Sequence, residues 1–181
     1  MVVAKPVLTN VLLVLVVVVA VAVAAPPPIA SGGDLVKTLC AKTEYPVECE
    51  TSIVPKPGQK LDAAVVLRLA MDVVRAKAAD AKKMANALIA DPKTARLELS
   101  PLHGCVELYD QTSDSLDRAD KAIAAGDKAT TATMLTSVSS DVSTCNQGFE
   151  DLHVTPLLSK QEEELGKFAS ICMEIATTGL R

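Results

Sequence analysis

The chain has 181 residues, of which 49% are hydrophobic and 2% aromatic, which is enough apolar material for one packed domain. Its 22 acidic residues outnumber its 18 lysines and arginines, and the resulting net charge of -4 has the wrong sign for a protein that binds the phosphate backbone of nucleic acids. With no Trp, two Tyr and two Phe, the chain cannot build a large stacking platform, so nucleic-acid and lectin-like sugar binding are both disfavoured.

Residues 1–24 have the features of a secretory signal peptide. One positive charge, Lys5, precedes an uninterrupted apolar run from Val11 to Ala25, and Ala22 and Ala24 fit the small-x-small cleavage pattern. We therefore expect a secreted protein in which residues 25–33 form a short flexible segment. The alternative is a membrane anchor, but this run is short for crossing a bilayer, so we expect no stable membrane insertion after cleavage.

Residues 34–58 are expected to form a helical hairpin. Two short helices, from Asp34 to Cys40 and from Pro46 to Val54, lie on either side of Tyr45-Pro46. Neither segment is long enough to be stable alone in water. A bridge between Cys40 and Cys49 would join them.

Residues 61–181 are expected to form four long helices, because apolar residues recur there at spacings of three and four. The third is expected to bury Ala132, Leu135 and Val138, and the fourth has Ser159 and Glu162 in a capping-box pattern ahead of inward-facing Leu165. Four such helices with short connectors predict an all-α, up-down-up-down four-helix bundle. The expected helices run from Leu61 to Asp91-Pro92, from Pro101 to Gly126, from the N-cap Asp127 to the connector at Asp151, and from Ser159 to Gly179.

The five cysteines all follow the leader, where disulfides form and persist. Five cysteines allow about fifteen arrangements of two bridges, so the pairing has to be argued from the fold. Cys105 and Cys145 each lie twenty residues from Ala125, so in an antiparallel pair of helices both sit about 30 Å from the turn and can bridge. With Cys40 paired to Cys49, Cys172 is left as a free thiol, which we expect to be an inert core residue.

This pattern resembles the plant invertase and pectin methylesterase inhibitor family over residues 34 to the C-terminus. The order and spacing of several short motifs carry the resemblance. They are Leu39-Cys40, Tyr45-Pro46 with Cys49, Cys105-x-x-x-Tyr109, Gly126-Asp127 and Thr144-Cys145-x-x-x-Phe149.

The resemblance implies a four-helix bundle with an N-terminal hairpin and the same two bridges. It also implies a non-enzymatic role without a cofactor, in which the bundle covers the substrate cleft of a secreted carbohydrate-active enzyme in a non-covalent 1:1 complex. The expected location is the apoplast or cell wall, or the vacuole for an invertase-directed member. We expect a monomer, although a hairpin swapped between two copies would give a dimer.

Two regions bear on the target enzyme. Invertase-directed members have a Pro-Lys-Phe tripeptide after the Gly-Asp of the turn, whereas this chain has Lys128-Ala129-Thr130 after Asp127. Thr144 is similar to an enzyme-facing position of pectin methylesterase inhibitors, where acidic residues often follow the cysteine and this chain has Asn146-Gln147.

The resemblance therefore favours an inhibitor of pectin methylesterase. The alternatives are an inhibitor of acid invertase, or a secreted helical protein that kept the fold without inhibiting. The expected partner-binding residues are Thr144, Asn146, Gln147, Asp127 and Lys128.

Catalytic and metal-site patterns are weak. Neither His103 nor His153 accompanies a recognised nucleophile motif, no Cys-x-x-Cys pair occurs, and no Gly-rich phosphate loop is present, so we expect no catalytic residues, metal or cofactor. Carboxylate pairs such as Glu162 with Glu164 are expected to be solvated or to cap a helix. Tyr109 is expected to pack around the second bridge.

Overall fold

A computed structural model describes residues 32–180, and this part of the chain contains six helices and no strand. The predicted signal peptide, residues 1–24, and most of the flexible segment 25–33 lie outside the described residues. The helices are α1 (Gly32–Cys40), α2 (Pro46–Ser52), α3 (Ala63–Ala90), α4 (Arg96–Ala125), α5 (Lys128–Glu150) and α6 (Ser159–Gly179).

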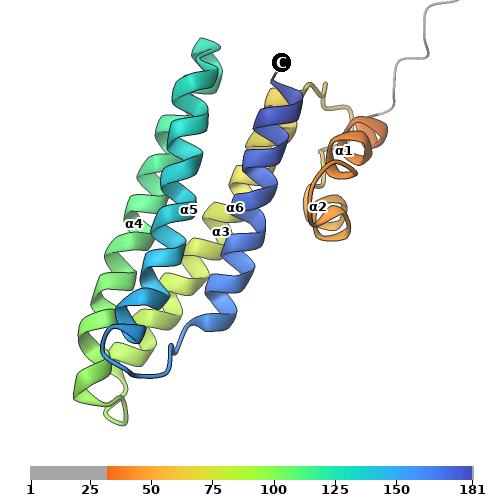
Figure 1. Ribbon diagram of the computed structural model, residues 1–181. Coiled ribbons are helices and arrows are strands. Elements are labelled where there is room, and N and C mark those ends of the chain that lie inside the picture. Colours follow the sequence, from red (N-terminus) through yellow and green to blue (C-terminus); the bar gives the residue numbers. More distant parts are fainter. Residues whose placement is uncertain (1–31, 181) are drawn as a thin grey trace, which may run out of the picture.

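The four long helices form the predicted antiparallel bundle, and the hairpin of α1 and α2 lies beside one end of α3 and α6 (Figure 1). Around the bundle, α3 packs on α4 and α6, and α5 packs on the same two helices. One continuous apolar core fills the centre and extends beneath the hairpin. Its largest fully buried side chains include Phe149, Phe168, Ile53, Leu67, Met71, Leu102, Leu116, Leu135 and Leu165.

The third long helix, α5, turns a slightly different face inward from the one predicted. Thr131 is buried and Ala132 is exposed. Burial of Thr131 leaves its hydroxyl satisfied, because Oγ1 donates to the Asp127 carbonyl at 2.8 Å. The spacing of apolar residues could not predict the burial of Thr131, because threonine is counted as a polar surface residue.

Helix α4 begins five residues before the predicted start at Pro101. The Ala95 N–H donates to Glu98 Oε2 at 2.9 Å, and the Thr94 hydroxyl donates to the Leu88 carbonyl at 2.6 Å, so the preceding turn is closed by hydrogen bonds. Pro101 therefore lies inside the helix. There its missing N–H leaves one carbonyl, that of Leu97, without a helical donor.

The predicted capping box at the start of α6 is wrong. The N-cap is Leu158, and the Ser159 hydroxyl donates to the Pro156 carbonyl at 2.9 Å. Glu162 is turned inward and is 4% exposed. The reason lies in the helical period, because Glu162 is three residues before Leu165 and so belongs to the buried stripe of α6.

Both predicted disulfides are present. Cys40 pairs with Cys49 at a Cα–Cα distance of 5.5 Å, and Cys105 pairs with Cys145 at 4.8 Å. Cys172 is free and buried, and burial raises the pKa of its thiol well above the ordinary value. A thiol held protonated in this way is a poor nucleophile, as expected for a core cysteine.

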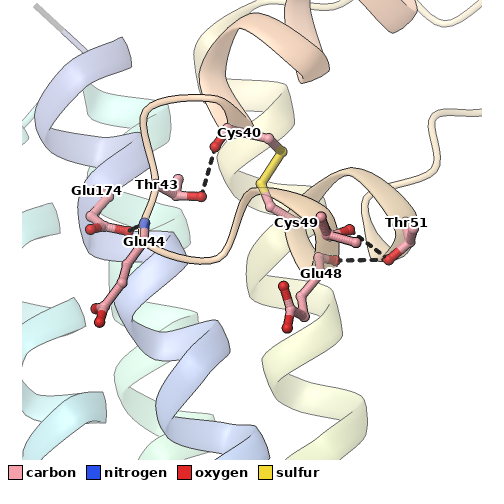
Figure 2. Close-up of a disulfide and its surroundings, with 8 residues drawn as sticks. Cys40, Thr43, Glu44, Glu48, Cys49, Thr51 and Glu174 are labelled. Atoms are coloured by element: carbon pink, nitrogen blue, oxygen red, sulfur yellow. Dashed lines mark hydrogen bonds between the residues drawn. A yellow bond between two sulfur atoms is a disulfide. The ribbon is translucent and has the colours of Figure 1, made fainter.

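The hairpin is held together by its disulfide, and a backbone N–H of the hairpin donates a hydrogen bond to a side chain of α6 (Figure 2). The Glu44 N–H donates to Glu174 Oε2 at 3.1 Å, and the buried Thr43 hydroxyl donates to the Cys40 carbonyl at 2.8 Å. Most of the attachment is apolar, since Val36, Leu39 and other hairpin residues join the main core. The hairpin thus packs on the bundle of its own chain.

Gly179, at the C-terminal end of α6, packs closely against the start of α3 and against α1 of the hairpin. A Cβ atom there would lie 2.8 Å from the Ala63 Cβ and 3.3 Å from the Leu39 Cδ2. Replacing Gly179 with leucine should therefore separate α6 from α3 and lower the free energy of unfolding by about 2 kcal/mol, a cost typical of overpacking. Thermal unfolding checks this, with Gly33→Leu as the control because no atom lies within 4 Å of its Cβ position. Equal melting temperatures for the two variants would contradict the close packing.

Candidate partner-binding surface

The five residues predicted to bind a partner separate into two groups at opposite ends of α5. Asp127 and Lys128 lie at its start, and Thr144, Asn146 and Gln147 lie in its last two turns. At a rise of 1.5 Å per residue the two groups are about 25 Å apart along the helix. They can face one partner together only if it spans most of the length of α5.

Asp127 has a structural role at the turn between α4 and α5. Gly126 adopts a positive φ of 69°, and the Asp127 carboxylate then caps α5 by accepting from the Thr130 N–H at 2.9 Å and the Thr130 hydroxyl at 2.7 Å. These hydrogen bonds hold the pKa of Asp127 below its usual value. Lys128 is exposed and lies beside two adjoining hollows where this turn meets the C-terminal end of α6.

Thr144 is exposed at a groove between α4 and α5. Its hydroxyl donates to the Ser140 carbonyl at 2.8 Å, which leaves only acceptor capacity facing outward. The groove passes above the Cys105–Cys145 bridge, and Gly104 and Gly148 on its walls leave it open. Because Cys145 directly follows Thr144, its bridge to Cys105 holds the backbone at Thr144 in place.

Asn146 and Gln147 lie on other sides of α5. Asn146 is half-buried beside α6, and its Oδ1 atom accepts no hydrogen bond within the described part of the chain. Gln147 is exposed and points away from the bundle. Thr144, Asn146 and Gln147 thus lie on different sides of α5 near its C-terminal end.

The outer face of α5 differs in chemistry from that of its neighbours. It is rich in short hydroxyl side chains, each donating to a backbone carbonyl of the preceding turn. These residues are Thr133, Thr136, Ser137, Ser143 and Thr144. By contrast, the surface shared by α3 and α4 carries cross-helix ion pairs, namely Arg68 to Asp120 at 2.6 Å, Arg75 to Asp117 at 2.9 Å and Lys82 to Asp110 at 2.5 Å.

The sequence did not reveal a buried polar pair beneath this face. The Tyr109 hydroxyl donates to Glu162 Oε1 and lies 3.5 Å from Cys145 Sγ. Burial raises the pKa of Glu162 from its ordinary 4.5 to about 7, although the hydrogen bond from Tyr109 acts in the opposite direction. Tyr109 does pack around the bridge as predicted. The position of Glu162 on the apolar stripe of α6 was the signal that could have shown its burial.

Cysteine, histidine and carboxylate side chains are the usual ligands of metal ions in proteins. His103 and His153 are both exposed, and residues 32–180 contain no group of three His, Cys, Asp or Glu side chains placed to hold a metal ion. Glu164 is engaged by Lys77 and Lys167, which lowers its pKa. None of the helices in this part of the chain is long and apolar enough to cross a membrane.

Two solved structures share the fold of this chain. A crystal structure of a mutant form of a pectin methylesterase inhibitor from Arabidopsis superposes with a TM-score of 0.63 at 18% identity, covering 78% of this chain and 94% of that one. A crystal structure of a pectin methylesterase inhibitor from Arabidopsis thaliana gives a TM-score of 0.59 at 19% identity, covering 81% and 97%. A search of curated protein sequences found no significant match.

The resemblance drawn from the sequence is confirmed at the level of the family. The pattern that defines the plant invertase/pectin methylesterase inhibitor family matches residues 34–175, which is most of the chain. Together with the helical bundle and its two bridges, this match shows that the chain belongs to the plant invertase/pectin methylesterase inhibitor family.

Proposed function

We propose that this protein inhibits pectin methylesterase by covering the substrate cleft of the enzyme in a non-covalent 1:1 complex. The observation that carries the proposal, within a family of inhibitors, is the outer face of α5. It offers the exposed Thr144 and Gln147 and the half-buried Asn146 next to a disulfide, on a helix whose outer hydroxyls are hydrogen-bonded to its backbone. Inhibition by occlusion requires only such a surface and no catalytic group.

The physical advantage of this face is its low cost of docking. Long charged side chains lose up to about 2 kcal/mol of rotamer entropy each when they are immobilised, whereas Ser and Thr lose much less. The α5 hydroxyls are already fixed by hydrogen bonds to the helix backbone. Little conformational entropy remains to be lost when a partner packs against them.

Acid invertase is the second candidate target. A complex of that kind would use the turn between α4 and α5, where Asp127 and Lys128 are exposed. Against it, the segment Lys128-Ala129-Thr130 lacks the Pro and Phe of the invertase-directed motif. Two solved structures of similar fold are pectin methylesterase inhibitors, which is consistent with the first candidate.

Inhibition assays distinguish the candidates. The chain lacking residues 1–24 is incubated at mildly acidic pH with a plant pectin methylesterase and, separately, with an acid invertase. We expect loss of methyl-ester hydrolysis with sucrose hydrolysis unchanged. Loss of sucrose hydrolysis alone would instead identify an invertase inhibitor, and no effect on either enzyme would indicate a member of the family that does not inhibit these targets.

The proposal includes the layout and location of the chain. Residues 1–24 act as a signal peptide, residues 25–33 as a flexible segment, residues 34–58 as the hairpin and residues 61–181 as the bundle. The mature protein is secreted to the apoplast or cell wall and acts as a monomer, with neither enzymatic activity nor a cofactor. The presence of two disulfides supports an oxidising compartment.

A further inference from the structure

A second groove, between α5 and α6, has both polar and apolar residues in its lining. Its volume is about 270 Å³, and it lies on the side of α5 opposite to the groove at Thr144. Six polar residues line it, namely Ser139, Ser143, Asn146, Ser159, Glu162 and Glu163. We refer to it as the α5–α6 groove.

Nearly every polar group in the α5–α6 groove is a hydrogen-bond acceptor. The three serine hydroxyls have already donated their protons to backbone carbonyls, so only their lone pairs are free. These hydrogen bonds are Ser139 to Leu135 at 3.4 Å, Ser143 to Ser140 at 3.0 Å and Ser159 to Pro156 at 2.9 Å. Carboxylates are acceptors when ionised, so the Asn146 amide nitrogen is the one uncommitted side-chain donor in this lining.

Two of these acceptors are buried and unsatisfied. Glu162 is 4% exposed, and while its Oε1 accepts from Tyr109, its Oε2 has no hydrogen-bond partner among the described residues. The Asn146 Oδ1 is in the same condition. A buried acceptor without a donor has lost its hydration with nothing in return, so a donor from a partner would stabilise it.

We propose that the α5–α6 groove receives the side chain of a lysine or arginine from the enzyme that this protein inhibits. An ammonium carries three donors and a guanidinium five, which matches an acceptor-lined groove better than a hydroxyl with its single donor. Val142 and Ala169, which also line the groove, can pack against the methylene groups of such a side chain. This inference rests on the proposed function for the identity of the partner.

Charge favours the same occupant. Lys167 already pairs with Glu163 at 2.9 Å and with Glu164 at 3.3 Å, so those carboxylates are compensated. Glu162 makes no ion pair in the described part of the chain. Because burial raises the pKa of Glu162 to about 7, a cation that binds in the groove is expected to displace this proton and leave the carboxylate ionised. An acidic sugar would instead keep the carboxyl group neutral.

A small cation tests the chemistry of the groove without the enzyme. The ¹⁵N-labelled chain lacking residues 1–24 is titrated at pH 7.5 with n-butylguanidinium, and with tetramethylammonium as a cation that has no N–H donor. We expect saturable chemical-shift changes centred on Ser143, Asn146 and Gly166 with the first probe and none with the second. Equal responses to both probes, or no saturable response to n-butylguanidinium, would overturn the proposal.

Two matched glycine variants locate the effect. Gly166 lines this groove and Gly104 lines the groove at Thr144, and a Cβ atom on either would have no neighbour within 4 Å. Methionine at either position should therefore leave the melting temperature unchanged or raised, because glycine is unfavourable within a helix. Gly166→Met should abolish binding of n-butylguanidinium and Gly104→Met should retain it. Retention by both variants would contradict this location.

Assays with the enzyme complete the test. With pectin methylesterase, Gly166→Met should weaken inhibition at least tenfold. If the unmodified chain inhibits and Gly166→Met inhibits equally well, the groove proposal fails while the proposed function stands. If the unmodified chain does not inhibit either candidate enzyme, the proposed function fails and with it the enzyme as occupant, whereas the probe titration still decides whether the groove binds cations.

Discussion

Replacing Cys105 and Cys145 together with alanine should lower the free energy of unfolding by about 4 kcal/mol, given that the bridge closes a loop of 40 residues. This loss arises mainly because the unfolded chain regains the conformations that the bridge removes. It is a large share of the 5–15 kcal/mol that typically stabilises a domain. The bridge also fixes α5 against α4 beside Thr144, so the proposed binding face loses its support as well.

Denaturant unfolding with and without the bridge measures this effect. The matched control is the double alanine variant of Cys40 and Cys49, whose bridge spans nine residues and should contribute about 2.5 kcal/mol. We expect the control to loosen the hairpin and leave most of the bundle stability intact. A Cys105/Cys145 variant that unfolds at the same denaturant concentration as the parent would show that core packing alone holds α4 to α5.

The second large effect is a loss of stability as the pH rises through the range that Glu162 titrates. Burial raises the pKa of Glu162 from 4.5 to about 7, so between these values the folded chain holds a proton that the unfolded chain has released. Protonation of Glu162 therefore contributes fully to the free energy of unfolding below pH 4.5, and this contribution is lost as the pH rises to about 7. A difference of this size corresponds to about 3 kcal/mol.

The pH dependence is measured by unfolding the protein between pH 4.5 and 8 and comparing it with Glu162→Gln. The variant should show a flatter profile, since glutamine accepts the Tyr109 hydroxyl without carrying a titrating proton. Asp141 also has a raised pKa, caused by burial, so the difference between the two profiles isolates Glu162. Tyr109→Phe should extend the decline to higher pH, because the hydrogen bond from Tyr109 lowers the pKa of Glu162. Parallel profiles for the parent and Glu162→Gln would contradict the assignment.

The helices and bridges could be predicted because their signals are local and repeated. Apolar spacing marked the buried stripes of α3 and α5, and the equal distance of Cys105 and Cys145 from the turn placed both at one level. The start of α4 could not be placed by the same reasoning, and the cap of α6 was predicted wrongly although its start at Ser159 was predicted correctly. In both cases one glutamate decided the outcome, since Glu98 caps upstream of Pro101 and Glu162 turns inward where a cap was expected.

The candidate binding face could be predicted only in part from the sequence. Family motifs drew attention to Thr144 and Asn146, but they could not show that these residues face two different grooves on opposite sides of α5. The partnership of Tyr109 with Glu162 joins α4 to α6 across 53 positions of the chain. Such contacts depend on how the helices are rotated against each other, which a single sequence does not specify.

The most direct test of the account is the inhibition of pectin methylesterase by the parent chain and by Thr144→Arg. Thr144 is exposed on α5, so arginine should leave the helical circular dichroism and the melting temperature unchanged while inhibition falls at least a hundredfold. Ala79→Arg is the matched control, because Ala79 is exposed on α3, away from the proposed face, and should inhibit like the parent. Full inhibition by Thr144→Arg would contradict the claim that the outer face of α5 covers the cleft of the enzyme.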